Sequence, residues 1–346
     1  MKFHKHKLAD SDKGYSITSM RLLGADRIIA ASEGRGPAVV FSSPEYSSRT
    51  VATEPGGCMG FAPLPDREDA LLMITEFYPI FKSEKAGIHV YEAESGFDAP
   101  WKGRRIIDLP FVHRIAVVKG AGISYLVAAT ICGGKEYQDD WSKPGAVYVS
   151  EVPAVVEGGW STEPILDGIH KNHGMSVSLI GGEECIYVTG TEGLFALIKP
   201  KTSGDEWRVE QMLDHEISEI FFADLDGDGE LEMAAIEPFH GDTLSVYKQQ
   251  GGDWTRIFSS ELSFGHGLWA GIFSDEVVIF VGNRAGTKDL SCFRIAETEP
   301  LAVEELTVDG GSGTTNVDVI HTGASQALIT SNAVHGEYAM YTAITE

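Results

Sequence analysis

Hydrophobic residues occur along this chain in short runs that are bounded by Gly, Asp or Pro, as in DRIIAASEG, DALLMITEFY and ECIYVTGTEG. These runs are rich in Val, Ile, Phe and Tyr, and several alternate hydrophobic and polar positions. Long stretches with the 3.6-residue period of an amphipathic helix are nearly absent. The pattern predicts an all-β protein.

The runs group into seven similar units, each with strands A, B and C and usually a fourth strand, D. The predicted A strands start near Ser16, Cys58, His113, His173, Ser218, His266 and Thr315. Their spacings of 42 to 60 residues are typical of β-propeller blades, which have roughly 40 to 50 residues plus loop insertions. We therefore predict a single seven-bladed β-propeller domain over residues 1–346. Two β-sandwiches are the structural alternative.

The seventh unit ends after its C strand, so its fourth strand is missing at the C-terminus. The N-terminal segment MKFHKHKLA precedes the first unit. We predict that residues near Phe3 to Leu8 complete the last blade and close the ring, which removes the exposed sheet edges.

Charge and composition exclude several classes of function. The chain has 27 basic and 51 acidic residues, and its net charge of -24 would repel a nucleic-acid backbone. No run approaches the roughly 18 apolar residues of a membrane span, and the N-terminus lacks the apolar core of a signal peptide. We expect a soluble, cytoplasmic protein without nucleic-acid or membrane partners. The four cysteines stand singly, which favours reduced thiols: Cys58, Cys132, Cys185 and Cys292.

One acidic loop has the spacing of a cation site. In the fifth unit, DLDGDGELE over residues 224–232 places carboxylates at its first, third, fifth and ninth positions. Carboxylate oxygens at this spacing, with Gly in the turn, suit Ca²⁺. The loop resembles the DxDGDGxxD/E loop of FG-GAP and VCBS-type propeller repeats, where it joins strands A and B. That resemblance implies a Ca²⁺ site on the side chains of Asp224, Asp226, Asp228 and Glu232, with the carbonyl of Glu230. A solvated acidic turn is the alternative.

Propeller topology places the start of each A strand and the end of each B strand at the same mouth of the central channel. Four of these positions in consecutive blades carry histidine: His113, His173, His240 and His266. The same reasoning places the following further residues at this mouth: Glu33, Arg35, Glu76, Tyr78, Arg114, His170, Glu192, Glu237, Arg284, Asn332 and His335. Each histidine alone is equally compatible with an ordinary loop residue, but their convergence indicates a site.

Histidine with glutamate is a ligand set for Zn²⁺, Mn²⁺ or Fe²⁺. We predict that His173, Glu237, His240 and His266 hold such an ion on the face opposite the acidic loop. The predicted catalytic residues are His113 as the proton-transfer group, Arg114 and Arg284 as substrate-gripping cations, and Tyr78. The predicted substrate contacts are Arg35, Asp140, Trp141, Trp269 and His335, although Trp269 fits a core position equally well.

No phosphate-binding loop, GxSxG elbow or dinucleotide fingerprint occurs in the sequence. A metal with histidine and arginine suits proton removal next to a carbonyl, followed by elimination or isomerisation. The chain resembles propeller carbohydrate lyases and the propeller part of fungal aldos-2-ulose dehydratases in its blades, DxDGDG loop and histidine-rich mouth. That resemblance implies a metal-dependent lyase or dehydratase acting on a small sugar or keto-sugar. The alternatives are a non-catalytic FG-GAP or VCBS-type binding propeller and a sugar-lactone hydrolase of the six-bladed type.

Overall fold

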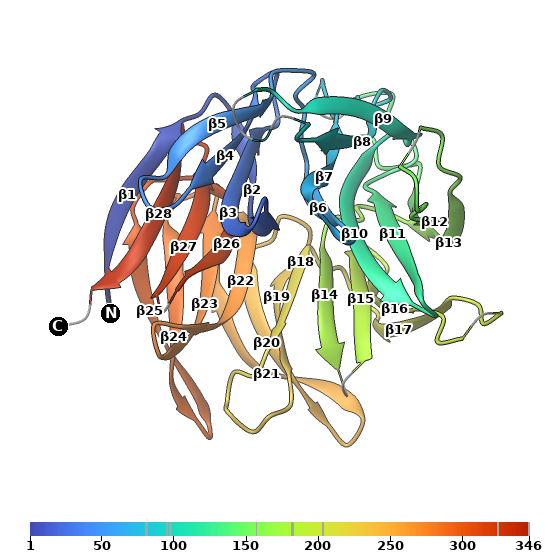
Figure 1. The fold of residues 1–346 in the computed structure, drawn as a ribbon. Helices are drawn as coiled ribbons and strands as arrows, with labels where there is room; N and C mark the ends of the chain where they lie inside the picture. Colours follow the sequence, from blue (N-terminus) through green and yellow to red (C-terminus); the bar gives the residue numbers. More distant parts are fainter. Residues whose placement is uncertain are drawn as a thin grey trace.

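Seven four-stranded antiparallel sheets are arranged around a central axis in the computed structural model (Figure 1). The structure describes residues 1–79, 82–94, 96, 99–156, 158–202 apart from 181 and 182, 204–323 and 325–344. Within these residues the regular structure is all β-strand, without a helix. The predicted seven-bladed β-propeller is confirmed.

Each blade is a meander in which the first strand lies nearest the axis. Blade 1 contains β2 (Gly14–Leu22), β3 (Ala25–Ser32), β4 (Ala38–Ser42) and β5 (Ser47–Ala52). Blade 2 contains β6 (Phe61–Leu64), β7 (Arg67–Thr75), β8 (Gly87–Glu92) and β9 (Lys102–Asp108). Blade 3 contains β10 (Val112–Gly120), β11 (Ile123–Thr130), β12 (Gly145–Glu151) and β13 (Glu163–Ile169).

The next three blades repeat this order. Blade 4 contains β14 (Met175–Ile180), β15 (Glu183–Gly190), β16 (Gly193–Ile198) and β17 (Arg208–Leu213). Blade 5 contains β18 (Glu219–Ala223), β19 (Glu232–Glu237), β20 (Thr243–Gln250) and β21 (Asp253–Glu261). Blade 6 contains β22 (Gly265–Phe273), β23 (Glu276–Asn283), β24 (Leu290–Thr298) and β25 (Leu301–Asp309). Every predicted blade start lies within three residues of the observed first strand.

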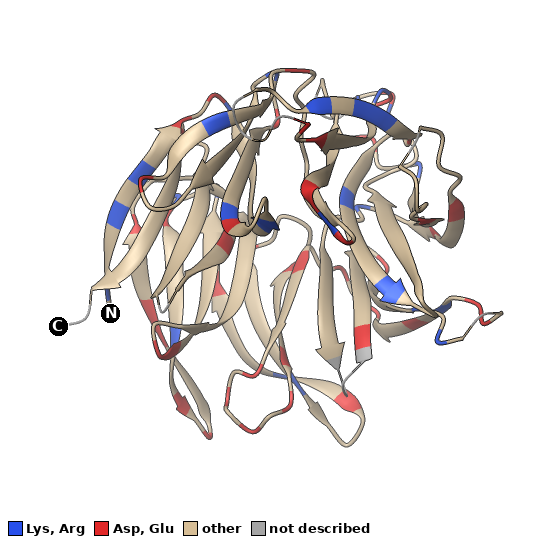
Figure 2. Cartoon of the chain, in the orientation of Figure 1, with Lys and Arg blue, Asp and Glu red and all other residues tan. Residues whose placement is uncertain are grey.

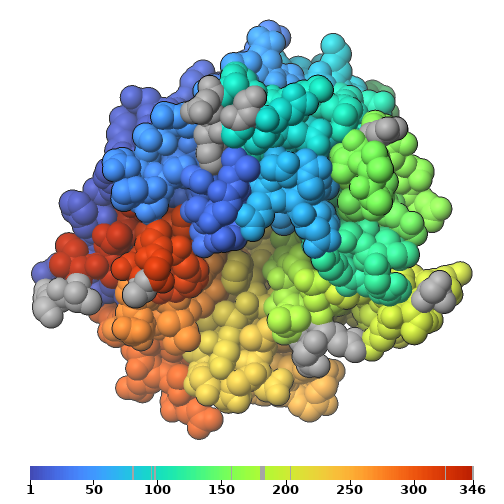
Figure 3. All heavy atoms as spheres, viewed as in Figure 1, coloured from blue at the N-terminus to red at the C-terminus, as the bar shows by residue number. Residues whose placement is uncertain are grey.

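The last blade joins the two ends of the chain. It contains β26 (Thr314–Thr322), β27 (Ser325–Asn332), β28 (Glu337–Ile344) and the N-terminal strand β1 (Lys2–Asp10). Strand β1 pairs antiparallel with β28, from Lys2 opposite Ile344 to Asp10 opposite Glu337. Figure 3 shows the blue N-terminal residues beside the red C-terminal blade. The predicted closure of the ring by the N-terminal strand is therefore present.

The hydrophobic core is divided among the spaces between neighbouring blades. Between blades 7 and 1, for example, Ile17 and Ile28 pack with Ile320, Ile329 and Tyr338. The innermost strands of neighbouring blades contact one another and line the central channel. Acidic residues lie at many turns and strand ends (Figure 2). No described helix is long and apolar enough to cross a membrane.

Candidate metal centre

Four histidine side chains meet at one end of the channel. His113 and His266 lie at the starts of β10 and β22, His173 directly precedes β14, and His240 follows β19. Three of them are almost completely buried, with 3% of His113, 1% of His173 and 2% of His266 exposed. The ring centre of His173 lies 4.6 Å from that of His113, 4.9 Å from His240 and 5.0 Å from His266. The structure thus brings together side chains from four consecutive blades.

Outer hydrogen bonds orient two of these rings. His266 Nδ1 donates to the carbonyl oxygen of Thr315 at 2.6 Å. His173 Nδ1 lies 2.7 Å from the carboxylate oxygen Oε1 of Glu219. In the neutral imidazoles the proton therefore stays on Nδ1, and the lone pair of Nε2 faces the other histidines.

The nitrogen positions fit a metal ion. His173, His240 and His266 each offer a nitrogen, and these three atoms lie within 4.8 Å of one another. The Nε2 atoms of His173 and His240 are 3.3 Å apart. Two nitrogens bound to one tetrahedral ion at about 2.0 to 2.1 Å lie ~3.3 to 3.4 Å apart. A carboxylate or carbonyl behind each ligating histidine is the usual outer arrangement of such sites.

Burial keeps these imidazoles neutral. It lowers the pKa of His240 to about 2, an effect to which His173 and nearby Arg284 add. It also places the pKa of His113 and His266 well below the usual value. In His173 burial again lowers the pKa, although Glu219 opposes the shift. Neutral imidazole is the form that binds a metal.

Glu219 was missed from the sequence, although it connects the centre to Arg114. Its Oε1 accepts a 2.8 Å bond from Arg114 Nη2, and the two side chains are 12% and 14% exposed. Burial favours a raised pKa for Glu219, but the charges and hydrogen bonds of Arg114 and His173 together outweigh it, and the pKa falls below its usual value. The carboxylate is therefore ionised beside His173. Glu219 lies at the start of the innermost strand β18, as Arg114 does in β10. This shared position could have predicted from the sequence that both residues lie at the same end of the channel.

Tyr15 is a second residue that the sequence reasoning missed. Its hydroxyl lies 3.3 Å from His113 Nε2 and 3.4 Å from His266 Nε2. The Nδ1 atom of His113 lies 3.1 Å from Arg114 Nη1, which only donates. Arg114 Nη1 also lies 3.4 Å from His113 Nε2, so both ring nitrogens of His113 lie beside this guanidinium. Both His113 and Tyr15 line a small cavity at the histidine cluster.

Two cavities flank the histidines. The outer one has a volume of only about 50 Å³. Its lining includes Tyr15, Glu33, Phe77, Phe111, His113, Lys135, His173, His240, His266 and Arg284. The second lies on the channel side and has a volume of about 280 Å³. Its lining includes Arg114, Ser176, Val177, Glu219, Phe221, His266, Leu268 and Asn316.

The predicted metal ligand Glu237 lies in a different cluster. Its carboxylate accepts bonds from Ser245 Oγ at 2.9 Å and Tyr247 Oη at 2.7 Å, and it lies 3.0 Å from His215 Nε2. His215 follows the outermost strand of blade 4, so this contact joins two blades. We call such a histidine–carboxylate contact between blades a blade latch.

Other histidines predicted for the mouth also form blade latches. His170 Nδ1 lies 2.6 Å from Glu192 Oε1. His335 Nδ1 lies 3.5 Å from Asp309 and 3.6 Å from Glu337, beside the Lys5 ammonium group of the closing strand. The structure therefore places His335 with charges that join β1 to the last blade rather than with the four central histidines.

The remaining predicted substrate contacts are dispersed. Arg35 stacks on the ring of Tyr78 with 5.2 Å between the guanidinium carbon and the ring centre, in a separate groove. Asp140 accepts bonds from Ser142 and from the backbone of Glu136, and these bonds lower its pKa to about 2. Such bonds organise its loop.

The two predicted tryptophans differ in their surroundings. Trp141 packs edge to face on Phe239, next to His240 in the chain, with ring centres 5.3 Å apart. Trp269 instead packs against Phe221 and Phe280 at 5.8 and 5.9 Å. Trp269 thus occupies the core position that the sequence left open as its alternative.

The acidic loop joins β18 to β19 at the end of the blade opposite the histidines. Asp224, Asp226 and Glu232 offer oxygens within 4.8 Å of one another. The ammonium group of Lys248 contacts Asp226 and lies 2.7 Å from Asp228 and 3.5 Å from Glu232. The loop therefore has carboxylates suited to a cation, and an internal cation already lies against them.

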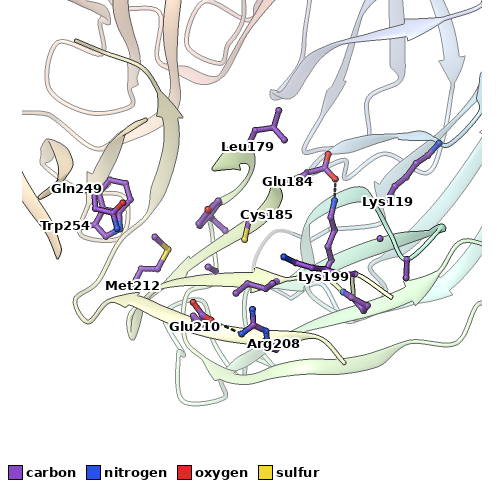
Figure 4. A pocket seen from close by; sticks show the side chains of 17 residues that line it. Lys119, Leu179, Glu184, Cys185, Lys199, Arg208, Glu210, Met212, Gln249 and Trp254 are labelled. Atoms are coloured by element: carbon purple, nitrogen blue, oxygen red, sulfur yellow. Dashed lines mark hydrogen bonds and ion pairs between the residues drawn. The ribbon is translucent and has the colours of Figure 1, made fainter. Parts of the chain in front are cut away.

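A larger groove of about 710 Å³ lies on the same side as the acidic loop (Figure 4). It combines apolar side chains such as Leu179 and Met212 with basic ones. Its charges are paired: Lys199 contacts Glu184 at 2.6 Å, and Arg208 contacts Glu210 at 3.5 Å. The groove contains no member of the histidine cluster, so volume alone does not identify the site of chemistry.

Comparisons with known proteins establish the fold. No family model matches the sequence, and no curated protein matches it. A structure of the mitotic checkpoint complex aligns with a TM-score of 0.63 at 10% identity, over 99% of this chain and 91% of that chain. Sqt1 of Saccharomyces cerevisiae aligns with a TM-score of 0.55 at 11% identity, over 100% and 99%. The PQQ-bound aldose sugar dehydrogenase of Streptomyces coelicolor aligns with a TM-score of 0.48 at 10% identity, over 99% and 98%. Membership of the FG-GAP or VCBS families stays a prediction.

Proposed function

We propose that this protein is a metal-dependent lyase or dehydratase that acts on a small sugar or keto-sugar. In this proposal a Zn²⁺, Mn²⁺ or Fe²⁺ ion is held by His173, His240 and His266, which we call the triad. One observation carries it: three histidines, two of them buried, each offer a ring nitrogen within 4.8 Å of the others, and the two buried rings contact Thr315 and Glu219 through Nδ1. Packing alone does not explain such an arrangement, because burying polar groups raises the free energy of the folded state unless those groups are paired.

The bound ion would polarise a substrate carbonyl and acidify the neighbouring C–H bond. Tyr15 and His113 form the adjacent proton-transfer pair, since their hydroxyl and Nε2 atoms lie 3.3 Å apart. Arg114 is held beside the site by Glu219 and offers a fixed cation for developing negative charge. Arg284 lies on the other side of the histidines, in the outer cavity. One member of the pair of Tyr15 and His113 would take up the proton next to the carbonyl and return it to the hydroxyl that leaves the following carbon, which would give water and the dehydrated sugar.

The alternatives are less well supported. A binding propeller predicts an apolar mouth with few titratable groups, whereas four histidines, two arginines and a tyrosine gather here. The sugar-lactone hydrolase alternative is of the six-bladed type, whereas this ring has seven sheets.

Metal analysis of protein purified without added metal tests the proposal. We expect about one transition-metal ion per chain, and its loss in His173→Ala and in His266→Ala. His170→Ala is the matched control, because His170 forms a blade latch with Glu192 and should leave the metal content unchanged. Unchanged metal content in both triad variants would refute the proposed centre. Sugar turnover by wild type is then compared with turnover by the metal-free variants.

We also propose that the acidic loop binds Ca²⁺ through Asp224, Asp226, Asp228 and Glu232. The carboxylate spacing supports this, and Glu232 Oε1 is buried without a hydrogen-bond partner among the described residues. Because Lys248 lies against the same oxygens, Ca²⁺ would have to displace its ammonium group. This ion would stabilise blade 5 and stand apart from the chemistry.

A further inference from the structure

The two sides of the histidine centre differ in room and in exposure. Inner-strand residues become more exposed with distance from the histidines: Val177 is 40%, Leu179 63% and Ile272 61% exposed. On the outer side Phe77, Phe111 and Lys135 are buried. The outer cavity of about 50 Å³ has room for little more than one water molecule, which takes about 30 Å³ in the liquid. The cavity on the side of the acidic loop is therefore the roomier of the two.

The channel-side cavity has the size and lining of a small-ligand site. Its volume of about 280 Å³ is close to the lower limit of roughly 300 Å³ for such pockets. His266 lines this cavity as well as the outer one, so the two cavities meet at one of the three histidines. Polar groups converge from separate blades, with Ser176 on β14 and Asn316 on β26. Within the described chain neither of these two side chains has a hydrogen-bond partner, so both are available to a ligand.

The charge of this lining points to an uncharged ligand. Its two ionised side chains, Arg114 and Glu219, neutralise each other in a 2.8 Å ion pair. The hydroxyl of Ser176 and the amide of Asn316 both donate and accept hydrogen bonds. Apolar walls, including Phe221 and Leu268, suit the C–H faces of a ring. A neutral polyhydroxy compound satisfies all of these groups, whereas an anion would compete with Glu219.

We propose that the substrate of the histidine centre is a neutral monosaccharide-sized polyol or ketose. It binds in the channel-side cavity and enters through the central channel. This inference rests on the proposed function, and it moves the substrate away from the outer mouth where the sequence had placed it.

The test uses Co²⁺-loaded protein, whose visible spectrum reports on the metal, with D-fructose as the probe sugar. Two variants narrow the channel without touching the triad: Asn316→Phe and Val177→Trp. Val177 is already 40% exposed, so this second variant should fold even if the first does not. Lys135→Ala is the matched control, because it enlarges the outer cavity. Each variant is first checked for Co²⁺ stoichiometry and melting temperature.

In wild type we expect D-fructose to shift the Co²⁺ spectrum. The channel variants should need at least about ten times more sugar for half of this shift, and dipicolinate should remove their Co²⁺ at least about ten times more slowly. Lys135→Ala should match wild type in both measurements. Faster Co²⁺ removal from Lys135→Ala, with unchanged channel variants, would overturn the entry route. A spectrum that D-fructose leaves unchanged would overturn the ligand class. Absence of Co²⁺ binding in wild type would instead refute the metal centre itself, and this inference with it.

Discussion

Replacing Glu219 by glutamine separates two roles of one carboxylate. Glu219 Oε1 lies 2.7 Å from His173 Nδ1 and 2.8 Å from Arg114 Nη2. Glutamine keeps the shape and an acceptor oxygen for His173, but it removes the negative charge. Loss of such an outer partner weakens metal binding by roughly 10- to 100-fold, which corresponds to about 1.4 to 2.7 kcal/mol.

The same change leaves the Arg114 guanidinium buried without its counter-charge. Breaking a buried ion pair costs about 3 to 5 kcal/mol, and we expect the lower value because both side chains keep some exposure. Adding Arg114→Met to Glu219→Gln removes the unpaired charge. The double variant should therefore regain most of its stability, while its metal affinity stays low.

Two assays separate these effects: urea unfolding of the metal-free proteins, and zinc competition against a chromophoric chelator. Glu192→Gln is the control, since the side chains of Glu192 and His170 in this blade latch are each one-third exposed. This change should lower the free energy of unfolding by less than about 1 kcal/mol and leave zinc affinity unchanged. Zinc affinity equal to wild type in Glu219→Gln would refute the reasoning. So would a double variant that is no more stable than Glu219→Gln.

Three further predictions concern stability. Deleting residues 1–10 should lower the free energy of unfolding by several kcal/mol, because it unpairs β28; an unchanged melting temperature would contradict closure. Asp226→Ala should abolish any rise of melting temperature with Ca²⁺, because a ligand of the folded state stabilises by mass action; an unaltered Ca²⁺ response would exclude this carboxylate as a ligand. Acidifying the metal-free protein from about pH 7 to pH 4 should lower its urea midpoint. Burial lowers the pKa of His89 to about 4 and that of His240 to about 2. As the pH falls below about 6.5, these imidazoles therefore take up protons in the unfolded chain before they do so in the folded protein. The free energy of unfolding is therefore unaffected by these groups above about pH 6.5 and decreases below it. A midpoint independent of pH across this range would show that these groups are not buried as neutral imidazoles.

The fold was predictable because each blade repeats the same pattern of strands and turns. Strand register then placed His113, His173, His240 and His266 at one end of the channel. The sequence could not distinguish these from His170 and His335, because both groups occupy loops on the same face.

What separates them is the distance from the axis. The blade latches lie between outer strands, whereas the central histidines lie on or beside the innermost ones. Glu237 was misplaced for this reason: its carboxylate bonds to Ser245 and Tyr247 on β20, although the loop that follows it carries His240 to the axis. Tyr15 and Glu219 were missed because their partners come from other blades, and pairing across blades is a tertiary property.

The pairing of β1 with β28 has a consequence for biosynthesis. Lys5 of the first strand contacts Asp309, which is 304 residues further along the chain. At a synthesis rate of roughly 5 to 20 residues per second, the first strand leaves the ribosome at least about 15 seconds before its partner. During that time the nascent chain has an unpaired β-strand, and the blades already made form an open arc. Contacts between such distant residues form slowly, so we expect the pairing of β1 with β28 late in folding. A chain that ends before β28 would have nearly all of its blades formed, but the two edges of its ring would be open to other chains.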